Sequence, residues 1–86
     1  MVVNIGGTGE VKGAINLNPN IVAARKDIPN HIAKGGEEIG EVFGANTIDA
    51  IVSNRLPPNT IDWVRTLAGS HKVLKKGGKV SIRFQR

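Results

Sequence analysis

The sequence has no cysteine and no tyrosine, and its aromatic residues are one tryptophan and two phenylalanines. Without cysteine, neither disulfide bonds nor thiolate zinc ligands can stabilise the chain. His31 and His71 lie far apart in the sequence, so a histidine metal site is not expected either. No apolar run approaches the ~20 residues of a membrane helix, and the N-terminus lacks the layout of a signal peptide. We therefore expect a soluble segment with no membrane span and no metal.

The length of 86 residues allows one domain. A chain of this size buries only about 60 % of the surface that it exposes when unfolded, so its core is thin. Few aromatic residues also mean few surfaces on which single-stranded bases could stack. These limits indicate one small domain with modest stability.

The formal net charge of +5 is concentrated at one end of the chain. Six of the 12 basic residues follow position 71, where there is no acidic residue. A positive end attracts polyanions or an acidic partner protein. Alternatively, these side chains are a solvated helix end and the outward face of a strand, because lysine is favoured near a helix C-terminus. The six residues are Lys72, Lys75, Lys76, Lys79, Arg83 and Arg86.

The first unusual segment is VVNIGGTGE, residues 2–10, which places Gly6, Gly7 and Gly9 directly after an apolar run. Glycine there either permits a tight turn or lets another group approach the backbone. The pattern fits neither the dinucleotide fingerprint nor the phosphate-binding P-loop. The glycines therefore predict either the cradle of a ligand or a turn between two strands, and the two interpretations stay open.

Short apolar and β-branched runs bounded by glycine, asparagine or proline predict the strands. TIDAIVSN has the strongest strand pattern. KVSIRFQR alternates apolar and polar residues, which indicates a strand with one face in water. Strands are predicted for residues 2–5, 14–17, 31–34, 47–54 and 79–85.

One amphipathic helix is predicted between the last two of these strands. Asn59 or Thr60 is its expected cap, and the Gly77–Gly78 pair is its expected end, so that Lys75 and Lys76 lie in its last turn. The helical patterns of two shorter segments are weaker. A helix that starts near Ile21 has to end near Ile28 before Pro29. Residues 36–43 predict one helical turn, with Glu37 and Glu38 at its positive end.

Alternating strands and helices favour an α/β fold with a mostly parallel sheet of four or five strands. We expect strands 2–5 and 47–54 to be neighbours. In such sheets ligands bind at the carboxyl ends of the strands, here residues 6–9, Asn18, 35–38 and 53–55. A rival remains, because residues 6–13 are short enough to join 2–5 and 14–17 as an antiparallel hairpin.

In this order, the segments resemble the core of class I S-adenosylmethionine-dependent methyltransferases. VVNIGGTGE resembles the family's glycine-rich first motif, AINLNPN the second, HIAKGGEEI the third and TIDAIVSNRLPP the fourth. IDWVRTLAGSHKVLKKGGKVSI resembles its last helix and fifth strand. The likeness covers nearly all of the chain, and ordered agreement is harder to obtain by chance than one motif. It implies a single, compact, Rossmann-like domain.

The sequence also departs from the family in ways that point to a truncated version. Only GGTGEVKG separates the first two strands, so the usual helix is missing there. The ribose-binding acid corresponds to Asn18, and the acid of the first motif corresponds to Asn4; an amide can still bind hydroxyl groups but carries no charge. The final strand hairpin and a substrate cap are missing as well.

The resemblance implies that S-adenosylmethionine binds along the glycine loop, the second strand end and the third motif. Asn54, at the tip of the fourth strand, is expected near the reacting group in preference to Asp49. No catalytic residue can be assigned. His31 and His71 are expected to be structural or surface residues, and Trp63 to pack on the sheet. The implied cofactor-binding residues are Gly6, Gly7, Gly9, Asn18, Glu37, Glu38 and Asn54.

The segments INLNP, GEEIG and SNRLP resemble those of shortened methyltransferase-like modules. Such modules occur at the C-termini of bacterial polymorphic toxins of the Rhs and contact-dependent inhibition type. That resemblance implies an excised effector domain, residues 1–86, delivered as part of a larger secreted protein into a target-cell cytoplasm. It would act on RNA, DNA or protein and be neutralised by an acidic immunity protein that binds the basic end. The alternative is a cofactor-independent nucleic-acid-binding or nuclease-like effector.

Overall fold

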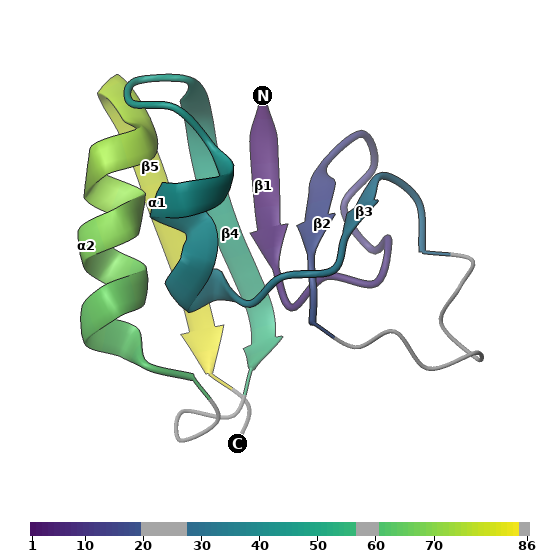
Figure 1. Ribbon diagram of the computed structural model, residues 1–86. Coiled ribbons are helices and arrows are strands. Elements are labelled where there is room, and N and C mark those ends of the chain that lie inside the picture. Colours follow the sequence, from purple (N-terminus) through teal and green to yellow (C-terminus); the bar gives the residue numbers. More distant parts are fainter. Residues whose placement is uncertain (20–27, 57–60, 85–86) are drawn as a thin grey trace.

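The computed structural model describes residues 1–19, 28–56 and 61–84 (Figure 1). Within these ranges a sheet is covered by short helices and loops. The strands are β1 (Val2–Ile5), β2 (Ile15–Leu17), β3 (His31–Ile32), β4 (Ile48–Leu56) and β5 (Leu74–Phe84). The helices are the 3₁₀-helix η2 (Gly36–Glu38), α1 (Ile39–Val42) and α2 (Trp63–Val73).

The five strands form one sheet in the order β3-β2-β1-β4-β5, and every neighbouring pair is parallel. β1 is central: Val3 pairs with Ile15 of β2 on one side and with Ile51 of β4 on the other. This confirms the predicted α/β, Rossmann-like fold and the predicted neighbours. The alternative hairpin between residues 2–5 and 14–17 is wrong, because these strands run in the same direction.

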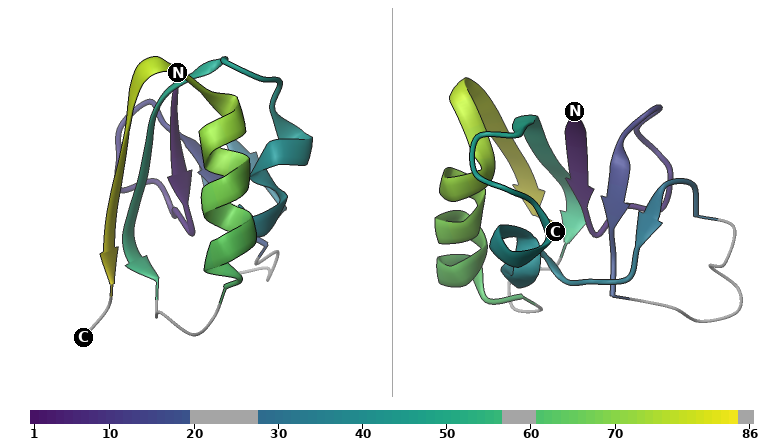
Figure 2. Two further views of the ribbon diagram at one scale, coloured as in Figure 1. Left: turned by 90° about the vertical axis from the view of Figure 1, so that its left-hand side faces the viewer. Right: turned by 45° about the horizontal axis from the view of Figure 1, so that its top comes forward.

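One face of the sheet, which we call the helix face, carries the apolar core. The edge-on view in Figure 2 shows α1 and α2 on the same side of the sheet. Side chains from β1, β2 and β4 point to this side, because residues paired in register share a face. Removal of their apolar surface from water is the main source of stability. The core consists of Val3, Ile5, Leu17, Ile39, Ile48, Ile51 and Val73.

The opposite face, which we call the loop face, is covered differently. Residues 6–14 join β1 to β2 without a helix. Parallel neighbours usually need a longer crossover. The side chains of Asn4 and Asn16 lie beneath this connection, and both are buried. Hydrogen bonds from these amides to the loop, described below, take the place of helix packing.

The last helix and strand differ from the prediction. α2 ends at Val73 and β5 begins at Leu74, so Lys75 and Lys76 lie on a strand and the Gly77–Gly78 pair lies inside it. Leu74 is extended (φ −70°, ψ 138°) and pairs with Ile48. The half-buried Leu74 packs against the core. Tertiary pairing therefore outweighs the local helical pattern of residues 74–76.

The start of α2 is fixed by Asp62, whose Oδ1 accepts a hydrogen bond of 3.2 Å from the backbone nitrogen of Arg65. This is a normal N-cap.

The caps that we predicted at Asn59 and Thr60 lie outside the described residues, as do the helix predicted to start at Ile21 and the basic residue Arg86. The strand predicted for 31–34 is shorter, and residues 36–42 form the 3₁₀ turn η2 followed by the α-helical turn α1.

Candidate functional site

The carboxyl ends of β1 and β2 meet the start of η2 around a small apolar cavity. Gly6 follows β1, Pro19 follows β2, and Gly36 and Glu37 begin the helical segment. The cavity measures about 60 Å³, well below the ~300–1,000 Å³ of typical ligand pockets. Its lining residues are Ile5, Gly6, Leu17, Pro19, Gly35, Gly36, Glu37 and Ile61.

The two adjacent glutamates that we predicted as ligands have different environments. Glu37 lines the cavity, and its Oε2 accepts a long hydrogen bond of 3.4 Å from the backbone nitrogen of Asp62. Glu38 does not line it: its Oε2 lies 3.7 Å from Lys34 Nζ, and its Oε1 accepts from the backbone nitrogen of Gly35 at 3.3 Å. Glu37 is therefore the carboxylate able to meet a ligand, whereas Glu38 stabilises the turn.

The atoms around Gly36 leave no room for a side chain at this position of the cavity. A Cβ atom there would lie 2.7 Å from Ile5 Cγ2 and 2.7 Å from Ile61 Cδ1, closer than real Cβ atoms come. The backbone of η2 consequently packs directly on β1. This close approach brings the first turn, including Glu37, to the end of the central strand.

The predicted glycine loop has a structural reason for each glycine. Gly6 and Gly9 have φ values of 72° and 103°, a region that other residues rarely adopt. A Cβ on Gly7 would overlap Asn16 Oδ1 and lie 2.7 Å from Asn4 Cγ. Only Gly6 of the three lines the apolar cavity. The turn interpretation thus accounts for Gly7 and Gly9.

Asn4 and Asn16 are paired in register across β1 and β2, and together they hold the loop. Asn4 Nδ2 donates to Glu10 Oε1 at 2.8 Å, and Asn16 Oδ1 accepts from the backbone nitrogen of Gly9 at 3.2 Å. Asn16 Nδ2 donates to the carbonyl of Pro29 at 2.6 Å. Buried amides need such partners. Sequence reasoning missed this pair, although VNI and INL show the signal: an asparagine between two apolar residues of a buried strand.

Asn18, predicted to contact a ribose, lies at the same edge and is used within the protein. Its Nδ2 donates to the carbonyl of Gly7 at 3.1 Å, and its own carbonyl lies 2.7 Å from His31 Nε2. Asn18 is half-buried and does not line the cavity. It ties the glycine loop to β2 and β3, which gives His31 the structural role that we expected.

A second, larger hollow lies on the loop face where β1, β4 and β5 end. Its volume is about 450 Å³, and Thr8, Glu10, Asn54 and Arg83 line it. The strand order reverses between β1 and β4, and in open parallel sheets ligands bind at that switch point. Asn54, predicted near a reaction site, therefore lies beside polar groups of the β1–β2 connection and of β5. We did not predict Thr8 and Glu10, because only the folded loop brings them there.

The predicted basic surface divides into engaged and free side chains. Lys72 Nζ donates to the carbonyl of Gly40 at 2.8 Å, and Lys75 Nζ lies 3.2 Å from Asp49 Oδ1. In the part of the chain that the structure describes, the remaining cations of β5 form no ion pair. These cations are Lys76, Lys79 and Arg83, all exposed.

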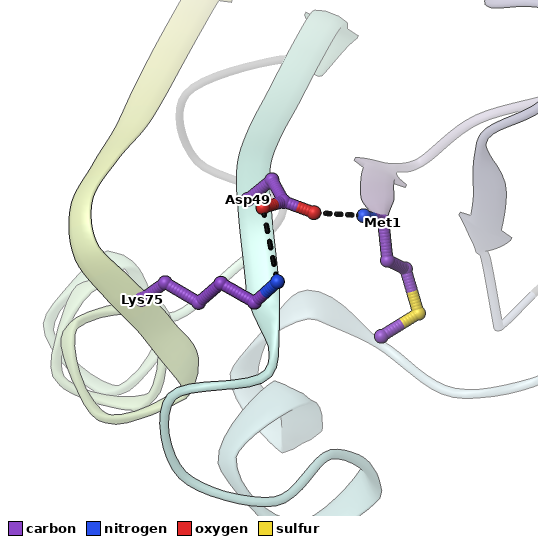
Figure 3. Close-up of polar contacts among 3 residues, drawn as sticks. All are labelled: Met1, Asp49 and Lys75. Carbon is purple, nitrogen blue, oxygen red and sulfur yellow. Dashed lines mark hydrogen bonds and ion pairs between the residues drawn. The ribbon is translucent and has the colours of Figure 1, made fainter.

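Asp49 sits at the amino-terminal edge of the sheet, far from the strand tips just described. Figure 3 shows its carboxylate between the N-terminal ammonium of Met1 and the Lys75 side chain. The hydrogen bond from that ammonium, followed by the one from Lys75, holds the pKa of Asp49 below its ordinary value. This cluster is exposed, so water screens it strongly.

Comparison with known proteins assigns no function to the chain, so a functional proposal depends on the geometry of the site. No protein family, curated protein or solved structure matches the chain. Among the described residues, no helix is long and apolar enough to cross a membrane, and no three histidine, aspartate or glutamate side chains gather as metal ligands would.

Proposed function

We propose that the chain is an effector domain with a methyltransferase-like fold that binds S-adenosylmethionine or a similar adenosine ligand at the carboxyl edge of β1 and β2. The observation that carries this proposal is the parallel order β3-β2-β1-β4-β5, together with Gly6 and Glu37 at one cavity beside the central strand. Open parallel sheets bind ligands at this edge. When bound, S-adenosylmethionine would supply a methyl group.

The cavity lining suits one part of such a ligand. The half-buried Ile61, next to the buried Ile5 and Leu17, offers apolar surface to a purine ring, and Glu37 offers a carboxylate that can accept hydrogen bonds from an amino or hydroxyl group. The bare backbone of Gly6 and Gly36 allows close approach. At about 60 Å³, however, the space admits only the ligand's edge unless the Glu37 side chain turns outward. We therefore expect weak binding.

Calorimetric titration with S-adenosylmethionine and its demethylated product tests this proposal. Protein at about 0.1 mM detects affinities near 100 μM. Glu37→Gln should weaken binding by roughly tenfold, because a hydrogen bond to a charged group is lost. Glu38→Gln is the matched control, since Glu38 faces Lys34 and not the cavity; its affinity should stay unchanged. No heat with either ligand, or equal losses in both variants, contradicts the proposal.

A second candidate rests on the exposed cations of β5, Lys76, Lys79 and Arg83, of which Arg83 lines the polar hollow at the strand ends. Exposed cations attract nucleic acid phosphates, so a cofactor-independent RNA- or DNA-binding or nuclease-like effector is the alternative. Dialysed protein incubated with total RNA separates the two candidates. Cleavage without added cofactor favours the alternative, whereas methyl transfer to RNA, DNA or protein requires S-adenosylmethionine.

As an effector, the domain would reach the target-cell cytoplasm as part of a larger secreted protein and would be neutralised by an acidic immunity protein. The basic end that we assign to this partner comprises Lys72, Lys75, Lys76, Lys79, Arg83 and Arg86. Expression of the chain in a bacterial cytoplasm should arrest growth, and coexpression with the immunity protein should restore it. Normal growth, with the protein present in soluble form, contradicts the toxin proposal.

A further inference from the structure

β5 is an edge strand, and its pairing with β4 is regular from Lys79 to Ile82, between register shifts at Ile48/Ala50 and Ser53/Leu56. It spans Leu74–Phe84, whereas β3 at the opposite edge spans only His31–Ile32. Within residues 1–19, 28–56 and 61–84, β5 pairs with β4 alone. A free strand edge presents a row of unpaired N–H and C=O groups, which is a template for another strand.

The two faces of this edge differ in chemistry. Lys79 and Ser81 pair with Ala50 and Val52 of β4, so they and Arg83 point to the loop face. All three are exposed. An added strand would place every second side chain next to the two cations.

Apolar groups lie on the other side of the same edge. Val80 pairs with Ile51 on the helix face and is 39 % exposed. Leu67 of α2 is 49 % exposed. It lies on the flank of α2 turned away from α1, since Gly69 contacts Gly40 and two residues turn a helix by roughly 200°. Figures 1 and 2 show α2 on the helix face at the β5 end of the sheet. The remaining side chains of an added strand would therefore meet apolar surface.

A second copy of the chain does not suit this edge. Antiparallel pairing of two β5 strands about a twofold axis at Ser81 would place Lys79 of each copy opposite Arg83 of the other. Like charges on directly opposed residues destabilise strand pairing. Charged side chains on edge strands are a common protection against self-association. These cations therefore disfavour pairing with a second copy of the chain and favour pairing with an acidic strand.

We propose that an acidic partner protein binds by adding an extended strand to β5, with Asp or Glu side chains alternating with apolar ones. The acidic side chains lie beside Lys79 and Arg83 on the loop face, and the apolar ones cover Val80 on the helix face. Backbone hydrogen bonds supply affinity and the alternating side chains supply specificity. This inference rests on the acidic partner of the proposed function but not on adenosine binding.

The test uses a peptide probe, acetyl-Glu-Val-Glu-Ile-Glu-Val-Glu-amide with a fluorophore, and the intact chain at about 0.15 M salt, where exposed charges are screened beyond ~8 Å. In a strand, alternate residues direct their N–H groups to the same edge. Methylating the backbone nitrogens of one alternate set should therefore abolish binding, and methylating the other set should leave it unchanged. The rearranged peptide acetyl-Glu-Glu-Val-Ile-Val-Glu-Glu-amide, of equal charge, should bind at least roughly tenfold more weakly, because its charges no longer alternate.

Variants of the protein locate the surface. Lys79→Glu combined with Arg83→Glu should weaken probe binding by roughly tenfold or more, because two facing charge pairs become repulsive. Lys12→Glu combined with Arg65→Glu makes the same change in net charge at exposed positions off β5 and should leave binding unchanged. Circular dichroism of both double variants checks that the fold is retained.

Three results overturn the inference. Equal effects of the two methylated sets, or no effect of either, show that no strand is added. Equal losses in the two double variants show that net charge alone attracts the probe. Binding of a uridine oligonucleotide through Lys79 and Arg83, with no binding of the peptide, makes this edge a nucleic-acid surface. Because no adenosine ligand is present, none of these results bears on the calorimetric test, and an acidic immunity protein can still bind without adding a strand.

Discussion

The two faces of the sheet are built from the same strands yet are covered in different ways. On the helix face, Val3, Ile5 and Leu17 pack beneath the helical layer with at most 2 % exposure. On the loop face, the neighbouring residues Asn4 and Asn16 are equally buried but are amides. One face is held by apolar packing and the other by hydrogen bonds to an irregular loop.

The difference shows how a sheet can be covered without a helix. A helix satisfies its own backbone groups and needs only apolar contact from below, whereas a loop brings unpaired N–H and C=O groups that must find partners. Asn16 supplies both kinds of partner, accepting from Gly9 and donating to Pro29. The asparagines thus replace the apolar residues that a covering helix would need.

The largest effect is expected when an apolar residue of the helix face is replaced by an amide, or an amide of the loop face by an apolar residue. Leu17→Asn places an amide in the helix-face core, where Leu17 is fully buried. The free energy of unfolding should fall by about 3–5 kcal/mol, from lost apolar burial and an unsatisfied amide. Urea denaturation followed by circular dichroism measures this change.

The reciprocal variant Asn16→Leu provides the comparison. It keeps a similar volume but leaves the Gly9 N–H group and the Pro29 carbonyl without their partner, at a cost of about 1–3 kcal/mol. If Asn16→Leu instead stabilises the protein, the loop face behaves as an ordinary apolar face, and the distinction drawn above is wrong.

The fit of the loop over the asparagines predicts a somewhat smaller effect. Gly7→Ala should destabilise the protein by about 1–3 kcal/mol, since its Cβ would force Asn16 and Asn4 apart. Gly44→Ala is the matched control, because its Cβ would make an ordinary contact of 3.6 Å with Thr47 Cγ2. In a double-mutant cycle, Asn16→Ala should absorb part of the Gly7→Ala penalty. Strict additivity would mean that the two residues do not meet.

The smallest effect is expected at Asp49, at the edge that neither the helices nor the loop cover. Its folded-state pKa is lowered by the Met1 ammonium and by Lys75, so its carboxylate stabilises the folded protein above the unfolded pKa of about 3.9. That contribution is lost as the pH falls through the lower folded pKa. Asp49→Asn should therefore be slightly less stable than the original chain at pH 7, and the difference should vanish near pH 2. A difference that grows on acidification would contradict this assignment.

The strand positions were largely predictable, because short apolar runs bounded by glycine and proline leave few alternatives. The end of α2 was not. Residues 74–76 continue a helical pattern locally, but Leu74 gains a strand partner in Ile48 and a place against the core. The candidate site was predicted in part: Gly6 and Glu37 do line one cavity, whereas Asn18 and Glu38 bind other parts of the protein.

By itself, the sequence determined the α/β class, the apolar strands, the basic end and the absence of disulfide bonds, since these follow from composition and from periods of a few residues. Only the tertiary structure decided that Asn4 pairs with Asn16, that Glu10 and Thr8 line a hollow with Asn54 and Arg83, and that β5 pairs with β4 alone among the described strands. These features depend on strand order and register, which are fixed by contacts between residues far apart in the chain. A local sequence pattern does not determine which distant residue lies opposite a given residue in the sheet.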